Sequence, residues 1–187
     1  SVKIAVVGKY TKLEDAYKSL SEALIHGGLA NKTNVEITWM ESEEFEKIGQ
    51  TKRLNKFDGI LIPGGFGKRG TEGKIRVIKY AREKKIPFLG ICLGMQLLVI
   101  EFARNCAGLK DANSEEFEEK SPSSDDHLIY HLSKWIKDHK VEIRSKVENK
   151  GGTMRLGAYP AKIKKGTIAF SIYKNVLVSE RHRHRFE

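Results

Sequence analysis

Apolar residues in the first two-thirds of the chain alternate between short continuous runs and helical spacing. Runs rich in Val, Ile, Leu and Phe predict four strands, at residues 2–7, 35–40, 57–62 and 87–91. Spacing near 3.6 predicts three helices, at residues 13–26, 71–84 and 93–106, the first of them stopped by Gly27 and Gly28. Strands joined by crossover helices form parallel sheets, and sites in such sheets lie beyond the carboxyl ends of the strands. The pattern therefore predicts an α/β fold with a mostly parallel, doubly wound sheet.

The last third of the chain has a different pattern. A polar break at residues 120–126 separates it from the α/β part, and residues 127–139 fit either a helix or a strand. Residues 141–144, 153–156 and 167–172 predict short strands. We expect one domain over residues 1–187, in which about residues 127–187 form a small antiparallel β-rich addition to the core.

Composition and charge narrow the class of protein. The chain has 187 residues, of which 40% are hydrophobic, and 34 basic against 24 acidic side chains, a net charge of +10. This hydrophobic content excludes a disordered tail, and apolar runs as short as 4–7 and 97–100 predict no membrane partner. Two cysteines form no disulfide framework, which favours a reducing compartment such as the cytoplasm.

The basic excess peaks near the end of the sequence, from Arg181 to Arg185. No aromatic platform is interleaved with this cluster, so we expect no nucleic-acid partner. A solvated basic face and a site for small anions both remain open. His182 and His184 with two cysteines lack the usual spacing of zinc ligands, and we expect no metal.

The segment Gly90-Ile91-Cys92-Leu93-Gly94 carries the sharpest chemical pattern. It places one nucleophilic residue between a strand and a helix, with glycine two positions before and after it, as in a nucleophile elbow. Side chains at the flanking positions would collide in so tight a turn. The helix N-terminus would lower the pKa of the thiol, and its amides could receive an oxyanion. A buried, inert cysteine is the alternative.

A second glycine-rich segment, Pro63 to Gly67, follows the third predicted strand. Its bare amides suit an oxyanion hole at the same edge of the sheet as Cys92. Residues 65–70 also match the dinucleotide pattern G-x-G-x-x-G, but the helix starts late and the ribose-binding acid is missing. We therefore favour the oxyanion hole.

Together these motifs resemble a known family. The strings are Val7-Gly8-Lys9-Tyr10, Asp15-Ala16-Tyr17, residues 63–67, residues 90–96, residues 151–157 (GGTMRLG) and residues 180–187 (ERHRHRFE). The combination resembles the glutamine amidotransferase domain of the CTP synthases, which belongs to the class I (triad) amidotransferases. The resemblance implies a flavodoxin-like α/β core.

The resemblance also implies roles for particular residues. It implies that Cys92 is the nucleophile that forms a glutamyl thioester, and that the backbone of Gly64, Gly65 and Leu93 forms the oxyanion hole. The glutamine-binding positions that it implies are Gly65, Leu93, Gly94, Met95, Gln96, Glu116 and Arg185. A carboxylate and a guanidinium suit glutamine, because this substrate carries an α-ammonium and an α-carboxylate.

For the whole protein, the resemblance implies that L-glutamine yields ammonia for a separate amidoligase domain of the same polypeptide. That domain would use ATP, Mg²⁺ and UTP to make CTP, with GTP as allosteric activator, in a homotetramer. No cofactor is implied in the glutamine-hydrolysing domain.

The sequence departs from the family pattern at both ends. We expect that it lacks the N-terminal amidoligase domain and the C-terminal His-Pro-Glu motif that carries the catalytic base. Little turnover is then expected, because proton transfer contributes about 10²–10⁴-fold to such reactions. Two alternatives stay open: a catalytically inactive binding or regulatory module, and a different cysteine hydrolase such as a peptidase.

Overall fold

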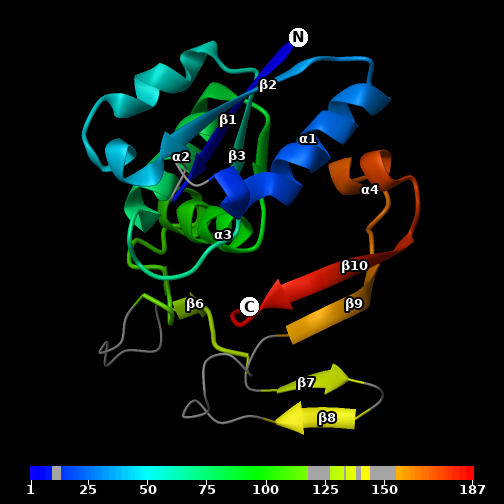
Figure 1. Cartoon of the computed structure of the whole chain (residues 1–187). Helices are drawn as coiled ribbons and strands as arrows, with labels where there is room; N and C mark the ends of the chain where they lie inside the picture. Colours follow the sequence, from blue (N-terminus) through cyan, green and yellow to red (C-terminus); the bar gives the residue numbers. More distant parts are fainter. Residues whose placement is uncertain (10–13, 118–126, 133, 138–139, 144–154) are drawn as a thin grey trace. The chain divides into compact units, whose positions relative to one another are not determined.

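The computed structural model describes residues 1–9, 14–117, 127–132, 134–137, 140–143 and 155–187 (Figure 1). They form two compact units, Ser1–Ile129 and Tyr130–Glu187. The boundary lies close to residue 127, where the β-rich addition is predicted to begin. Within the described part of the chain, none of the helices has the length and apolar character needed to cross a bilayer.

The first unit is built on a four-stranded parallel sheet. Its strands are β1 (Val2–Gly8), β2 (Val35–Glu41), β3 (Gly59–Ile62) and β4 (Phe88–Gly90), in the order β2-β1-β3-β4. The helices are α1 (Lys18–Ala30), α2 (Thr71–Lys84) and α3 (Leu93–Cys106). A short pair, β5 (Asn113–Ser114) and β6 (His127–Ile129), follows. The prediction of an α/β fold with a parallel sheet is confirmed.

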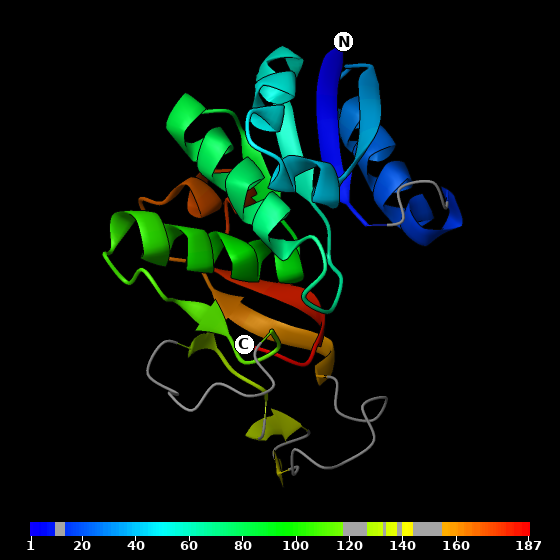
Figure 2. The same ribbon diagram turned by 90° about the vertical axis from the view of Figure 1, so that its left-hand side faces the viewer.

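The core lies between β1, β3 and the helices α2 and α3, which pack side by side (Figure 2). Val6, Ile62 and Leu97 are completely inaccessible to solvent. Two 3-10 helices, η2 (Ser42–Glu46) and η3 (Gln50–Lys56), bury Phe45 and Leu54 against this layer. The sequence analysis did not anticipate them, because their apolar residues are too few to show a period.

The end of the first helix was predicted wrongly. The chain forms a 3-10 turn, η1 (Glu14–Tyr17), and then α1, which continues through Gly27 and Gly28 to Ala30. A side chain at Gly28 would lie 2.6 Å from the carbonyl oxygen of Thr33. Gly28 thus permits a close approach of helix and following chain, and Asn31 ends the helix by donating from Nδ2 to the Gly27 carbonyl at 2.8 Å.

The second unit contains two antiparallel strand pairs, which confirms the antiparallel part of the prediction. They are β7 (Lys134–Lys137) with β8 (Lys140–Ile143), and β9 (Arg155–Lys162) with β10 (Leu177–His184). Between β9 and β10 lies α4 (Ile168–Tyr173). For residues 127–139 the described parts are β6 and β7, so the strand alternative is correct there. Residues 138–139, 144 and 153–154, which other predictions include, lie outside the described residues.

The strand predicted at residues 167–172 was wrong, because these residues form the helix α4. Thr167 lies at its N-cap, where its Oγ1 accepts a hydrogen bond from the Phe170 amide at 3.2 Å. A threonine N-cap satisfies an amide that the first turn would otherwise leave unpaired. The β-branched residues of this short apolar run favour a strand, but the N-cap hydrogen bond stabilises a helix instead.

Candidate active site

Cys92 lies in a strained turn between β4 and α3. Its backbone has φ 51° and ψ −108°, a region that residues with a side chain rarely occupy. Such strain costs of order 1–3 kcal/mol and persists only where the surrounding structure imposes it. This backbone conformation makes the chain turn sharply at residue 92, between the strand and the first turn of α3, as in a nucleophile elbow.

The two glycines of the elbow are required by backbone packing. A Cβ added at Gly90 would lie 2.6 Å from the carbonyl carbon and oxygen of Gly94. A Cβ at Gly94 would collide with the carbonyl oxygen of Ile62, in β3. Neither obstacle is a side chain that could rotate away. The steric reason predicted for the Gly-x-Cys-x-Gly pattern is confirmed.

Two backbone amides point at the thiol. The amides of Leu93 and Gly65 both hydrogen-bond the Cys92 sulfur, and these bonds lower its pKa. Burial is the larger cause and raises the pKa, with the Glu116 carboxylate acting in the same direction, so that the net shift is upward. The lowered pKa that the helix N-terminus led us to expect was therefore wrong, because the half-buried sulfur loses more hydration than two amides return.

The glycine loop lies directly against the elbow. A Cβ at Gly64 would be 3.3 Å from the Cys92 Cβ, so a side chain there would crowd the thiol. Gly67 has φ +78°, in the left-handed region that favours glycine. Gly65 of this loop and Leu93 of the elbow thus both direct their amides at the Cys92 sulfur, and two amides that converge in this way could receive an oxyanion.

Two charged side chains bind the backbone of the loop. Lys9, at the end of β1, donates from Nζ to the carbonyls of Phe66 and Gly67, at 3.0 and 3.1 Å. The Glu116 Oε1 accepts a hydrogen bond from the Gly67 amide at 2.7 Å. Since charged hydrogen bonds are stronger than neutral ones, the loop is fixed in place. A carboxylate on the Gly67 amide also disfavours the dinucleotide alternative, which needs loop amides for phosphate.

A buried lysine completes this charged group. Lys74, in the first turn of α2, is 1% exposed. Burial, together with the charge of Lys9, lowers its pKa to about 8, while the Glu116 carboxylate partly opposes the shift. The sequence analysis missed both lysines. Lys74 could have been found, because it precedes Ile78 and Ala81 by four and seven residues and so shares their buried face.

The other predicted glutamine-binding residues divide between the units. Gly94, Met95 and Gln96 lie in the first turn of α3, where Gly94 and Gln96 are buried and Met95 is half exposed. The Gln96 amide donates to the Cys92 carbonyl at 3.1 Å. Arg185 belongs to the second unit, where its carbonyl accepts from the Leu132 amide at 2.8 Å. Its role toward glutamine stays a prediction.

The groups that shift the pKa of Cys92 are two backbone amides and the Glu116 carboxylate, with burial as the largest cause. Cys106, at the other end of α3, is exposed. With Phe102 and Leu109 close by in the sequence, Cys106 is predicted to be a small core residue. This prediction is wrong, because the last turn of the helix faces solvent. Only Cys92, of the two thiols, lies among oriented backbone amides.

Known proteins match this chain closely. A family model described as glutamine amidotransferase class-I matches residues 12–187. The chain is 57% identical over 188 residues to a CTP synthase of Oleidesulfovibrio alaskensis, and 54% identical over 187 residues to one of Cereibacter sphaeroides; each match covers 100% of this chain and 34% of the relative. This chain therefore spans about a third of the length of these curated relatives. Among solved structures, the glutaminase domain of Trypanosoma brucei CTPS with bound acivicin matches with a TM-score of 0.82 and 39% identity, over 100% of this chain and 68% of that one.

Proposed function

The chain belongs to the class-I glutamine amidotransferase family, and from this premise we propose that it is the glutamine-hydrolysing region of a CTP synthase, with Cys92 as nucleophile. One observation carries the assignment. Cys92 is held in a strained backbone conformation in which the amides of Gly65 and Leu93 both point at its sulfur. A structural cysteine needs neither the strain nor the amides.

The proposed reaction begins with attack of the Cys92 sulfur on the side-chain amide carbon of glutamine. The carbonyl oxygen takes the negative charge and accepts hydrogen bonds from the Gly65 and Leu93 amides. The carbon–nitrogen bond then breaks, the nitrogen leaves as ammonia with the proton of the thiol, and a thioester remains. Water cleaves the thioester and gives glutamate and the free thiol. The sum is glutamine plus water to glutamate plus ammonia.

The two charged residues that bind the glycine loop, Glu116 and Lys9, have separate roles in this reaction. Glu116 would accept hydrogen bonds from the α-ammonium of glutamine; the proposal is supported by the capacity of a carboxylate to accept several hydrogen bonds, one of which already comes from the Gly67 amide. Lys9 holds the carbonyls of the same loop and so keeps the Gly65 amide aimed at the sulfur. We propose that Arg185 binds the α-carboxylate and that Met95 and Gln96 complete the substrate site.

The whole-protein activity is proposed from the similarity to longer CTP synthases. Ammonia would pass to an amidoligase region that converts UTP to CTP with ATP and Mg²⁺, GTP would activate glutamine hydrolysis, and four copies would assemble in the cytoplasm. Hydrolysis itself needs no cofactor. Because burial raises the pKa of Cys92, we propose that this chain alone forms the thioester slowly and turns over poorly.

The test is covalent labelling followed by intact-mass and peptide mass spectrometry. An L-glutamine analogue with a diazoketone or chloroketone in place of the amide should label Cys92 in the natural chain and in Cys106→Ser, but not in Cys92→Ser. L-glutamine should protect, and the D-enantiomer of the analogue should react slowly.

Iodoacetamide is the matched control reagent, because it has no features of glutamine. It should prefer the exposed Cys106, which reverses the selectivity. The raised pKa of Cys92 also favours a second candidate, an inactive binding module. Equal labelling of both cysteines by the L-analogue, or labelling that glutamine does not slow, would reject catalysis in favour of that module.

A further inference from the structure

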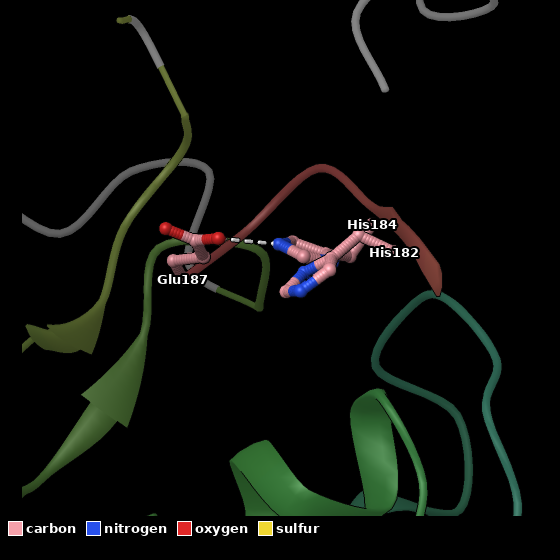
Figure 3. Close-up of side chains that lie close together, drawn as sticks. All are labelled: His182, His184 and Glu187. Atoms are coloured by element: carbon pink, nitrogen blue, oxygen red, sulfur yellow. Dashed lines mark hydrogen bonds and ion pairs between the residues drawn. The ribbon is translucent and has the colours of Figure 1, made fainter. Parts of the chain in front are cut away.

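Two histidines and a glutamate meet on the second unit. His182 and His184 are two residues apart on β10, so their side chains project from the same face of the strand. Glu187 follows the strand, and its Oε1 accepts a hydrogen bond from the His184 Nε2 at 2.5 Å. Figure 3 shows the three side chains gathered at one point. One ligand atom from each residue lies within 4.8 Å of the others.

The backbone around this cluster is fixed by hydrogen bonds within the same unit. The Glu187 amide donates to the Tyr130 carbonyl at 2.9 Å, and the Tyr130 amide donates to the Glu187 carbonyl at 2.8 Å. A bridge between His131 and Phe186 continues this pairing. On the other side, β9 pairs with β10 along its whole length and places Arg155 opposite His184. The position of Glu187 relative to the two imidazoles is thus set by backbone pairing.

We propose that His182, His184 and Glu187 form a binding site for a borderline transition-metal dication, with Zn²⁺ as the natural candidate. Two imidazole nitrogens and one carboxylate oxygen are a donor set that Zn²⁺ accepts, and three protein ligands leave a fourth position for water. Zinc–ligand bonds of about 2.0–2.1 Å separate neighbouring ligand atoms by roughly 3.3 Å, so small side-chain rotations suffice to close the cluster.

The charges around the cluster decide how strongly it binds. Arg181 and Arg183 are exposed and alternate with the histidines, so they project from the opposite face of β10. Arg155 lies on the side of the cluster, donates to the Glu187 Oε1, and stacks 4.0 Å from the centre of the Tyr159 ring. The metal would replace the hydrogen that joins His184 to Glu187 and compete with Arg155 for the carboxylate. We therefore infer a site that is selective but weakened by one arginine.

No third ligand could be predicted from the sequence. His-x-His alone is a weak pattern, and Glu187 joins it only because Tyr130, 57 positions earlier in the chain, pairs with the segment after β10. This site does not depend on the proposed hydrolysis of glutamine, since none of its residues has been given a part in that reaction.

The experiment is a metal titration of the full chain, made in a Cys92→Ser, Cys106→Ser background so that no thiol binds metal. Zn²⁺ is followed by calorimetry and Co²⁺ by its visible absorption, which reports coordination geometry. We expect one ion per chain and a tetrahedral or five-coordinate Co²⁺ spectrum. His182→Ala, His184→Ala and Glu187→Gln should each weaken binding at least about tenfold, since even the loss of an outer-shell partner of a metal ligand costs about 10–100-fold in affinity.

Two further variants make the result decisive. His26→Ala, which removes an exposed histidine from α1, should leave the affinity unchanged. Arg155→Met removes the competing cation and should tighten binding about fivefold. Binding that is insensitive to all three ligand substitutions, or that is absent at millimolar metal even in Arg155→Met, would overturn the proposal. Circular dichroism of each variant without metal shows that the fold is kept.

Discussion

The elbow at Cys92 and the cluster at His184 are positioned by different kinds of contact. At the elbow, backbone segments pack directly against one another. Gly90 and Gly94 are required there because no side chain fits, and packing imposes the conformation of Cys92. At His184, side chains meet on a two-stranded ribbon, and the alternation of a strand brings them together. The elbow is thus fixed by backbone contacts that exclude side chains, and the cluster by side chains that share one face of a strand.

The two sites also lie in units that differ in how deeply charged groups are buried. The first unit buries charged groups, with Glu101 completely inaccessible and Lys74 almost so. In the second unit, the pair of His184 with Glu187 keeps its carboxylate side chain 44% exposed, in contrast to the buried Glu101. Substitutions at the buried positions of the first unit should therefore have large effects that spread through the core, while those at the partly exposed cluster of the second unit should be local and small.

The largest effect is expected from Gly94→Ala. The added methyl group collides with the Ile62 carbonyl, and since neither α3 nor β3 can move without opening the core, we expect a loss of more than about 3 kcal/mol in the free energy of unfolding. Gly27→Ala in α1 is the matched control. Its Cβ meets nothing within 4 Å, so helix propensity alone should stabilise by about 0.5–1 kcal/mol. Urea denaturation measures both, and a mild effect of Gly94→Ala would show that the elbow is not fixed by backbone packing.

The next effect is expected from the buried pair between α2 and α3. Arg82 donates to Glu101 from Nε at 3.0 Å and from Nη2 at 2.8 Å, and Glu101 is buried while Arg82 is about one-third exposed. Arg82→Met leaves a carboxylate in the core, and we expect a loss of about 2 kcal/mol, reduced by the partial access of water. Lys79→Met, which breaks an exposed pair with Glu83 on the same helix, should cost less than about 0.5 kcal/mol. Equal losses in thermal unfolding would mean that burial does not distinguish these pairs.

The comparison also explains what the sequence could predict. The helices 71–84 and 93–106 have the predicted bounds, because strong apolar periodicity and clear ends act over a few residues. The elbow was predicted for the same reason, since its glycines and cysteine lie within five positions. Local rules were enough wherever the structure is decided by neighbours in sequence.

The features that the sequence did not reveal depend on distant contacts. Lys9 and Glu116 bind Gly67 across 58 and 49 positions, respectively, and no local pattern relates them. The sign of the shift in the pKa of Cys92 depends on burial, which sequence spacing does not report. The strand expected at 167–172 failed because a cap outweighed β propensity over a short segment.

A third, smaller effect of opposite sign is expected from Lys74→Met. Burial of the Lys74 ammonium costs stability, so an apolar side chain of similar length should stabilise the chain by about 1–2 kcal/mol at pH 7. The pKa of Lys74 is about 8 when folded and near 10.5 when unfolded, so between these values the unfolded chain holds a proton that the folded chain has lost. Rising pH then favours the folded state, and the advantage of Lys74→Met should shrink from pH 8 to pH 10.5. Melting temperatures across that range test it, and an advantage that is constant with pH would contradict a buried charge.

The smallest effect is expected in the second unit, from His184→Ala. The substitution removes the hydrogen bond between His184 and Glu187, but the Glu187 carboxylate is partly in water and keeps its bond to Arg155. Because an exposed pair contributes about 0–1 kcal/mol, we expect a loss below about 1 kcal/mol, several-fold less than for Arg82→Met. Amide hydrogen exchange should show the change confined to β9, β10 and their partner Tyr130, with α3 unaffected. A loss as large as that of Arg82→Met, or exchange that quickens in α3, would mean that the ribbon cluster supports the fold as the core pair does, and the contrast between the two sites would fail.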